Sequence, residues 1–311
     1  MLGEILDELG LEAIIDVHVH PLPELPEDTL LSELKKAQVG RCVLLALDLD
    51  PDVFEDRRER ARFMEALFNA GVWDVRALDM AREVLRRGRT PNERVAELVR
   101  KHGALFVGFG SVNPAKPRSY VVEKLAELVD YGFSGLKLIP TLQLFCPNKA
   151  RRNLELILRF CERSGLVVMW HTGCDPGPWE SPVLSECARP SLLKPFARAF
   201  ERAVFIVAHA GSYSATRPGV WFSEALELAE AHRNVWLDVA AVPYLLTEPE
   251  FARPLRSRGL MGRVLFGSDY PVVGGGASIA EAAEVVLRSG ELAPEEKAGV
   301  MALNARELLD G

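Results

Sequence analysis

Imidazole and carboxylate side chains recur at the ends of short apolar runs in this sequence. His18 and His20 lie at the end of AIIDVHVH, His171 near the end of LVVMWHT, His209 near the end of VFIVAHA, and Asp269 directly after RVLFGS. If these runs are parallel strands of a barrel, their carboxyl ends open onto one face and the side chains converge there. Nitrogen and oxygen donors of this kind suit zinc, which takes such ligands at about 2.0–2.2 Å.

The H-x-H pair is the most local of these signals. His18 and His20 are two positions apart, so on a strand both side chains point to the same side. Asp16 lies two positions before His18, so its side chain points to the same side of the strand, deeper in the barrel. We expect it to hydrogen-bond a ligand histidine. Alone the pair is a weak motif, because a single strand-end histidine is more often a hydrogen-bonded core residue. His102 and His232 follow predicted helices and are expected to be structural.

Eight apolar runs would position these side chains. Most are aliphatic on both faces, as expected of parallel strands covered by helices. The predicted strands are 13–20, 41–48, 104–111, 134–139, 166–172, 204–210, 235–239 and 263–268.

The segments between the runs have the periodicity of helices, with apolar residues at three- and four-residue spacing. We predict helices over 120–131, 153–163, 221–232, 278–287 and 294–309, and two or three more within 52–101.

Strands that alternate with helices favour either a closed (β/α)₈ TIM barrel, here with a C-terminal helix, or an open doubly wound sheet. The first predicted strand is not followed by G-x-G-x-x-G, and no Walker A loop is present, so a nucleotide-binding open sheet has little support. A barrel takes roughly 250 residues, and 311 residues accommodate one barrel with its loops. We find no internal repeat or linker and expect a single α/β domain over 1–311.

Composition restricts the partners. The chain is 48% hydrophobic and 26% charged with a net charge of −7, which gives no indication of binding to nucleic acid or to an anionic membrane. It has no apolar run of about 18 residues that could span a membrane, and its acidic N-terminus is a poor signal peptide. The five cysteines are odd in number and lack a C-x-x-C pair, which favours a reduced, cytoplasmic protein. We expect a small-molecule substrate, and helices around a barrel would allow a homodimer.

Loops that follow the strands are expected to set the substrate. The candidates are 21–28, 141–149 with Phe145 and Cys146, and 173–190 with Trp179.

Five short motifs, in chain order, resemble the amidohydrolase superfamily: DVHVH, GLKL, MWHTG, VAHAG and LFGSDYP. The branch it is most similar to includes aminocarboxymuconate-semialdehyde decarboxylase and resorcylate-type decarboxylases, and NARELL at 304–309 resembles the C-terminal helix of that branch. The resemblance runs from Asp16 to Leu309. It implies a (β/α)₈ barrel with a divalent metal at the carboxyl ends of the strands, and it leaves the reaction open.

The resemblance also implies the metal ligands. DVHVH places His18 and His20 as ligands from the first strand, MWHTG places His171 as the ligand from the fifth, and GSDYP places Asp269 as the ligand from the eighth. Zn²⁺ is the expected ion, although Mn²⁺ and Fe²⁺ also accept histidine and aspartate.

Two further positions have more than one implied role. VAHAG places His209 where it contacts substrate or water, or binds a second metal. GLKL places Lys137 where members with two metals carry a carboxylated lysine that bridges them, whereas members with one metal can carry a lysine without that role. A second ion would therefore need a carboxylated Lys137.

These residues permit acid–base chemistry. Bound Zn²⁺ can lower the pKa of its water to about 7, and Asp269 could take a proton from that water and return it to the leaving group. His209 could donate a hydrogen bond to developing negative charge. Lys137 could bridge two metals or bind a substrate carboxylate.

Three functions remain open at this point. The first is a metal-dependent hydrolase acting on an amide, lactone or related ester. The second is a metal-dependent decarboxylase, a lyase, acting on a small carboxylic acid, aromatic acids included. The third is a metal-binding barrel without catalytic activity, and a histidine beyond the four ligands, His209, argues against it.

Overall fold

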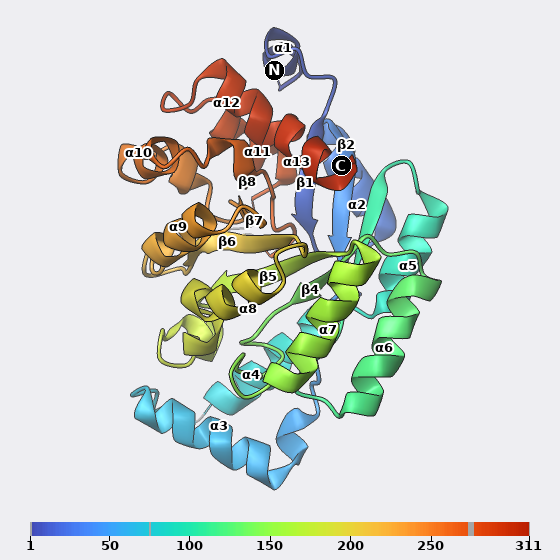
Figure 1. Cartoon of the computed structure of the whole chain (residues 1–311), viewed down its shortest axis with the longest axis vertical. Coiled ribbons are helices and arrows are strands. Elements are labelled where there is room, and N and C mark those ends of the chain that lie inside the picture. The colour runs from blue at the N-terminus through green and yellow to red at the C-terminus, as the bar shows by residue number, and fades with distance from the viewer. Residues whose placement is uncertain (1, 75, 273–276, 311) are drawn as a thin grey trace.

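The computed structural model describes residues 2–74, 76–272 and 277–310, and a parallel sheet forms its centre (Figure 1). The strands follow one another around the sheet in chain order, and each sequential pair is parallel. They are β1 (Ile14–Val19), β2 (Val39–Leu45), β3 (Phe106–Ser111), β4 (Gly135–Leu138), β5 (Val167–Gly173), β6 (Phe205–Tyr213), β7 (Val235–Asp238) and β8 (Val264–Leu265).

Main-chain hydrogen bonds between β1 and the segment that follows β8 complete the barrel. The amide of Val17 donates to the carbonyl of Phe266 at 3.0 Å, and the amide of Asp269 donates to the carbonyl of His18 at 2.8 Å. Val19 also forms an isolated parallel bridge with Tyr270. The fold is therefore the predicted (β/α)₈ barrel, and the open-sheet alternative is excluded.

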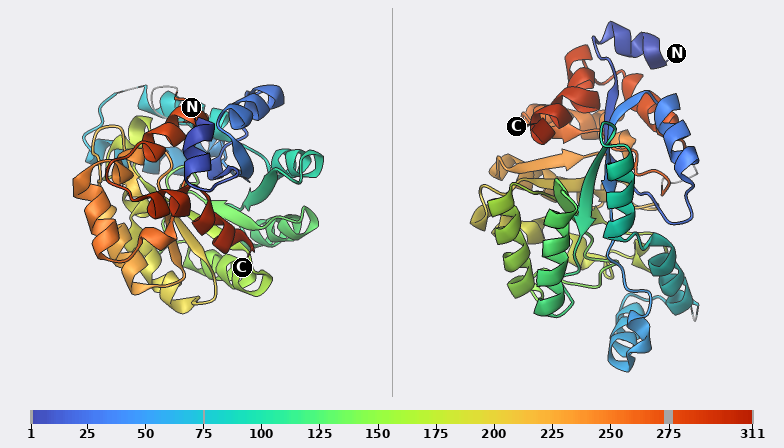
Figure 2. Two further views of the ribbon diagram at one scale, coloured as in Figure 1. Left: turned by 90° about the horizontal axis from the view of Figure 1, so that it is seen from above. Right: turned by 90° about the vertical axis from the view of Figure 1, so that its right-hand side faces the viewer.

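Helices surround this barrel (Figure 2), because strands buried on both faces need an outer layer. They are α1 (Leu2–Glu8), α2 (Glu27–Lys36), α3 (Arg57–Asn69), α4 (Ala77–Gly88), α5 (Asn92–Lys101), α6 (Arg118–Asp130), α7 (Arg151–Ser164), α8 (Lys194–Ala199), α9 (Phe222–Ala231), α10 (Pro249–Ser257), α11 (Ile279–Leu287), α12 (Pro294–Ala298) and α13 (Asn304–Asp310). The last predicted helix is divided, because a π-helical turn at Gly299–Leu303 separates α12 from α13.

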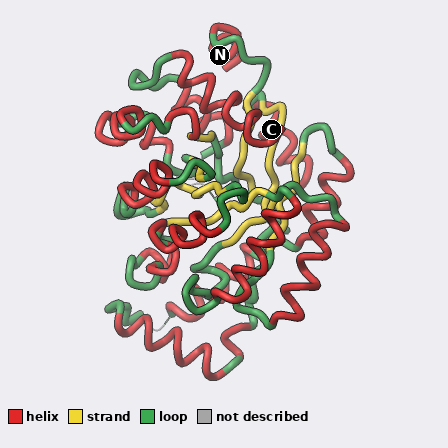
Figure 3. Tube along the Cα trace, viewed as in Figure 1, coloured by secondary structure: helices red, strands yellow, loops and turns green. Residues whose placement is uncertain are grey.

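The segment between β2 and β3 holds the helices predicted within 52–101. Two of these, α3 and α4, form what we call the cap. Apolar residues of the cap, including Phe63 and Leu85, form an apolar cluster separate from the barrel core. The cluster also contains Ile139 from the segment after β4 and Trp179 from the segment after β5. The cap therefore lies against loops at the carboxyl ends of the strands (Figure 3).

A disulfide joins two of those loops. Cys146, after β4, is bonded to Cys187, after β5, with their Cα atoms 4.8 Å apart. The prediction of wholly unpaired cysteines is therefore wrong, and the argument it gave for a cytoplasmic location loses its support. The 41-residue separation conceals the pair in the sequence, because only the barrel brings consecutive strand-end loops together.

Cys42, Cys161 and Cys174 are free and buried. Among the described residues, no helix is long and apolar enough to cross a membrane.

Candidate metal centre

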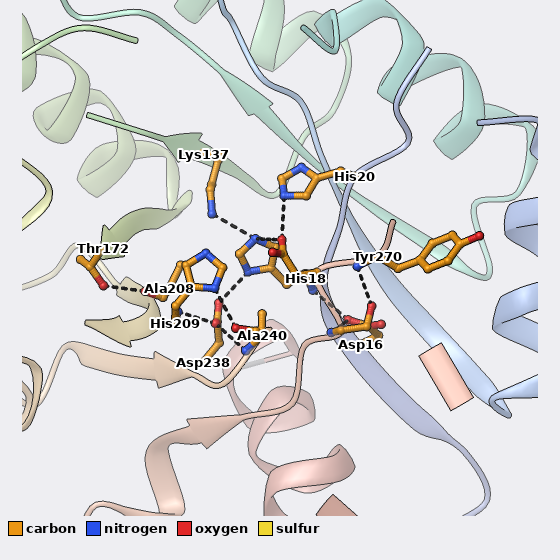
Figure 4. Close-up of polar contacts among 12 residues, drawn as sticks. Asp16, His18, His20, Lys137, Thr172, Ala208, His209, Asp238, Ala240 and Tyr270 are labelled. Carbon is orange, nitrogen blue, oxygen red and sulfur yellow. Dashed lines mark hydrogen bonds and ion pairs between the residues drawn. The ribbon is translucent and has the colours of Figure 1, made fainter. Parts of the chain in front are cut away.

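The carboxylate of Asp269 lies between the two histidines of the first strand. Its Oδ1 is 3.3 Å from Nε2 of His18 and 3.2 Å from Nε2 of His20, and all three side chains are buried. Figure 4 shows His18 and His20 with Lys137, His209 and Asp238 around them. The close approach of the two chain segments depends on Gly267, because a Cβ there would lie 2.7 Å from the Cβ of His18. Three residues predicted to bind metal are thus brought to one point.

Asp238, at the end of β7, orients the histidines. Its Oδ2 accepts a hydrogen bond from Nδ1 of His18 at 2.9 Å, and its Oδ1 accepts one from the main-chain amide of His209 at 2.7 Å. Because a carboxylate only accepts, the His18 proton lies on Nδ1 and the Nε2 lone pair is free for a metal.

Asp16 contacts main-chain amides rather than a side chain of the site. Its Oδ1 accepts hydrogen bonds from the main-chain amides of His18 and Ser268, both at 3.0 Å. The carboxylate thus fastens β1 to the segment after β8. The expected hydrogen bond between Asp16 and a ligand histidine is therefore present, but it involves the main-chain amide of His18, whereas Asp238, from a distant strand, bonds the ring.

His209 lies beside His18, with 4.8 Å between their ring centroids. Its Nδ1 is 2.8 Å from the carbonyl oxygen of Ala240 and therefore carries the proton. Burial lowers the pKa of His209 to about 4, so the ring is neutral near pH 7. A neutral ring with the proton on Nδ1 presents a lone pair at Nε2. His209 is accordingly suited to accept a proton or bind a metal, and it can donate from Nε2 only after protonation.

His171, on β5, lies on the other side of His209, with 4.9 Å between the ring centroids. Its Nε2 is buried without a hydrogen bond and lies 3.1 Å from Oδ2 of Asp175. Among the described residues, the groups of close donor atoms are His18, His20 and Asp269, and His18, His209 and Asp238. His171 belongs to neither group, so its assignment as a ligand stays a prediction.

Lys137 projects from β4 into the same site and is fully buried. Its Nζ is 3.2 Å from Nε2 of His18, so the amine donates toward the lone pair that a metal would use. Burial lowers the pKa of Lys137 to about 8, despite the nearby carboxylates of Asp238 and Asp269. The amine does not reach solvent, and a role of Lys137 in the chemistry of the site stays a prediction.

The electrostatics favour the protonation states that metal binding requires. Burial, together with the charge of Lys137, lowers the pKa of His18 well below its usual value. Burial raises the pKa of Asp269, but nearby His18 and His20 outweigh it and keep that pKa well below the ordinary range. Neutral imidazoles and an ionised carboxylate are the forms that bind divalent metals.

Two site residues have a backbone conformation that side chains disfavour. φ is 61° at His209 and 64° at Asp269, in the left-handed region. Such residues cost about 1–3 kcal/mol each and concentrate at functional sites. Here the amide of His209 donates to Asp238 and the amide of Asp269 to the carbonyl of His18, and these bonds hold both conformations.

Sequence reasoning missed three residues beside the centre. Asp175 accepts a hydrogen bond from the hydroxyl of Thr141 and contacts His171. Tyr213 lies with its ring centroid 4.4 Å from that of His209. Burial raises the pKa of Tyr213 well above its usual value, as does Asp269, with which its hydroxyl is hydrogen-bonded.

These residues left little signal. Tyr213 lies beyond the predicted end of its strand at 210, whereas β6 continues to residue 213. Asp175 and Thr141 lie inside the loops that were predicted to set the substrate, without a motif that distinguishes them.

The donor set fits a divalent metal. Imidazole nitrogens and carboxylate oxygens of His18, His20 and Asp269 lie within 4.8 Å of one another and are buried. Zn²⁺, Mn²⁺ and Fe²⁺ all accept this combination. Nε2 of His171, which is buried and has no hydrogen bond, is a further candidate donor, although it lies outside this group.

Comparison with known proteins agrees with the fold and the motifs. The profile of a family described as amidohydrolase matches residues 15–311. No curated protein matches the chain in sequence.

Several solved structures resemble the chain over almost its whole length. An uncharacterised TIM-barrel protein from Bordetella bronchiseptica is 19% identical with a TM-score of 0.67, over 96% of this chain and 98% of that one. A probable 2-pyrone-4,6-dicarboxylic acid hydrolase from Acinetobacter baumannii, with citric acid bound, is 14% identical with a TM-score of 0.60, over 96% and 99%. A 2,6-dihydroxybenzoate decarboxylase from Rhizobium is 16% identical with a TM-score of 0.58, over 97% and 100%. At these identities the likeness supports the barrel fold.

Proposed function

This chain belongs to the amidohydrolase family, and on that premise we propose that it is a metal-dependent hydrolase of an amide, lactone or related ester of a small molecule. One observation carries the proposal. The carboxylate of Asp269 lies 3.2–3.3 Å from two imidazoles whose Nε2 atoms converge on it in a buried site. That arrangement supplies metal ligands and a proton acceptor at one point.

His18, His20 and Asp269 would hold the ion, with His171 as a further candidate ligand. When bound, a divalent ion supplies Lewis-acid charge that polarises a substrate oxygen and makes water acidic enough to react near neutral pH. Asp238 accepts a hydrogen bond from Nδ1–H of His18, which keeps the proton on Nδ1 and leaves Nε2 unprotonated.

Proton transfer falls to Asp269 and His209. Asp269 is ionised and can accept a proton from the attacking water, then deliver it to the leaving group. The Nε2 lone pair of His209 faces the same site as a second acceptor. The buried hydroxyl of Tyr213 keeps its proton, since its pKa is well above the usual value, and it can donate to Asp269 or to a substrate oxygen.

Metal analysis and oxygen labelling test the proposal. We expect purified protein to contain zinc or manganese, to lose turnover of a responsive lactone or amide on chelation, and to regain it when the metal is restored. Hydrolysis in ¹⁸O-labelled water should place the label in the product acid. Turnover that survives complete metal removal would contradict the proposal.

A decarboxylase is the second candidate, and the burial of Lys137 favours it. A fully buried amine 3.2 Å from His18 provides a cation that could bind a substrate carboxylate. One of the similar structures is a decarboxylase of an aromatic acid. Release of CO₂ from an aromatic acid, without incorporation of labelled water oxygen into the organic product, would identify this reaction.

A further inference from the structure

A large cavity opens between the cap and the loops after β4 and β5. Its volume is about 850 Å³, within the range of about 300–1,000 Å³ typical of ligand sites. Aromatic side chains from three segments line it, namely Phe63, Phe145 and Trp179. We call it the mouth cavity.

One lining residue of the mouth cavity is linked by contacts to His171, beside the candidate metal centre. Thr141 lines the cavity and donates its hydroxyl hydrogen to Asp175. Asp175 in turn lies 3.1 Å from Nε2 of His171. A ligand that fills the cavity would therefore lie between this wall and α3, outside the group of His18, His20 and Asp269, which do not line the cavity.

The charged groups around the cavity are mainly cationic. The lining contains Arg62, Lys149, Arg151 and Arg152, and Glu59 is the acidic residue among them.

Two of these cations have carboxylate partners on their own helix. Arg62 pairs with Glu59 at 3.2 Å, and Arg151 pairs with Glu155 at 2.7 Å. Within the described ranges, neither Lys149 nor Arg152 forms an ion pair, so both are available to a ligand.

The position of these two cations is unfavourable without an anion. α7 begins at Arg151, and its first turn contains no acidic residue. The amino end of a helix carries partial positive charge, so acidic side chains are favoured there and basic ones are disfavoured. Lys149 and Arg152 add positive charge at this end, and an anionic ligand would relieve the repulsion.

We propose that the mouth cavity binds the acidic group of a substrate that carries it on an apolar stem, away from the bond that reacts. Phe63, Phe145 and Trp179 would contact the stem, and Lys149 and Arg152 would bind the anion. The proposal rests on the proposed function for the location of the reacting bond, and it narrows the substrates to organic acids longer than a single small ring.

A matched pair of probes tests the cavity without any turnover. Naphthalene-2-sulfonate carries an anion on an aromatic body, 2-naphthol is its neutral counterpart, and a sulfonate is a poor metal ligand. With the zinc-loaded protein in calorimetry, we expect the sulfonate to bind about tenfold more tightly, a difference of about 1.4 kcal/mol. Removing the metal should leave the Kd of naphthalene-2-sulfonate unchanged.

Substitutions locate the anion site. Lys149→Ala and Arg152→Ala should each weaken sulfonate binding about threefold or more, as expected for exposed charge pairs, and leave naphthol binding unchanged. Lys149→Arg keeps the positive charge and should retain sulfonate binding. Arg159→Ala, at an exposed position on the same helix outside the lining, is the matched control and should have no effect.

Three outcomes would overturn the proposal: no binding of the sulfonate, equal binding of both probes, or loss of sulfonate affinity when the metal is removed. The last would place the probe at the metal centre. If the protein instead fails the metal and turnover tests but shows the expected probe binding, the proposed function fails and the anion site stands.

Discussion

His18 has contacts on both ring nitrogens, and these explain why its protonation state matters. Nδ1 donates to Asp238, while Nε2 faces both Lys137 and Asp269. Without a metal, the amine of Lys137 competes for the lone pair that an ion would use. His18 would hold an ion through this Nε2 only if the Lys137 amine moved away, and Lys137 could then contact a substrate anion or be carboxylated.

The first prediction concerns Asp269. In Asp269→Asn the amide can still offer an oxygen, but it cannot accept the proton. We expect most of the metal to remain while turnover falls at least about 100-fold, the usual scale for a general base. Metal content by elemental analysis and kcat on the same sample would check this. Unchanged turnover would remove Asp269 from proton transfer.

The second prediction concerns the pH dependence of stability at Asp16. Burial raises its pKa to about 7, although amide hydrogen bonds from Ser268 and His18 oppose the shift. Between about pH 4 and 7 the folded protein thus holds a proton that the unfolded chain has released. The stability that this proton contributes is present below about pH 4 and is lost as pH rises to 7.

Asp16→Asn removes this titration. For metal-free protein, we expect the free energy of unfolding of wild type, minus that of the variant, to fall by a few kcal/mol between about pH 4 and 7. Urea titrations at a series of pH values measure it. A difference that stays constant with pH would show that Asp16 is ionised throughout.

At the scale of elements, the strands were predictable because each one carries its own signal. A run such as VFIVAHA is apolar on both faces, and all eight predicted strands overlap observed ones. The convergence of His18, His20 and Asp269 followed from parallel topology alone. The interactions between distant segments were not predictable, because their signal is divided between parts of the chain that only the fold unites. The bond from Asp238 to His18 and the Cys146–Cys187 pair are of this kind.

The third prediction concerns that disulfide. It closes a segment of 41 residues between two strand-end loops, and a cross-link of this length typically stabilises by about 2–4 kcal/mol. We expect Cys187→Ser to lower the free energy of unfolding by that order in urea under non-reducing conditions. Under reducing conditions the variant and the wild type should converge. Equal stability in both conditions would contradict the prediction.

At the scale of the whole molecule, the candidate metal centre connects distant parts of the barrel. His18 and His20 come from the end of β1 and Asp269 from the segment after β8, so an ion held there would link the first and last strands. A ligand that binds only the folded state stabilises it according to its concentration relative to Kd.

The fourth prediction follows from this link. Zinc at about 100 times its Kd should raise the free energy of unfolding by about 2.7 kcal/mol over the chelated protein. Differential scanning calorimetry with increasing zinc would show a rising Tm. His20→Ala removes one donor, so the variant should need a higher zinc concentration for the same rise in Tm. A Tm independent of zinc would exclude a site confined to the folded state.

The left-handed backbone at His209 has a consequence for engineering this protein. Glycine tolerates a φ of 61°, whereas an L-residue with a Cβ is disfavoured there by roughly 1–2 kcal/mol. His209→Gly should therefore melt later than His209→Ala, by an amount corresponding to about 1 kcal/mol, although both lose the imidazole. A design for thermostability that considered the backbone conformation alone would select glycine at this position and discard the imidazole to which we assign proton transfer.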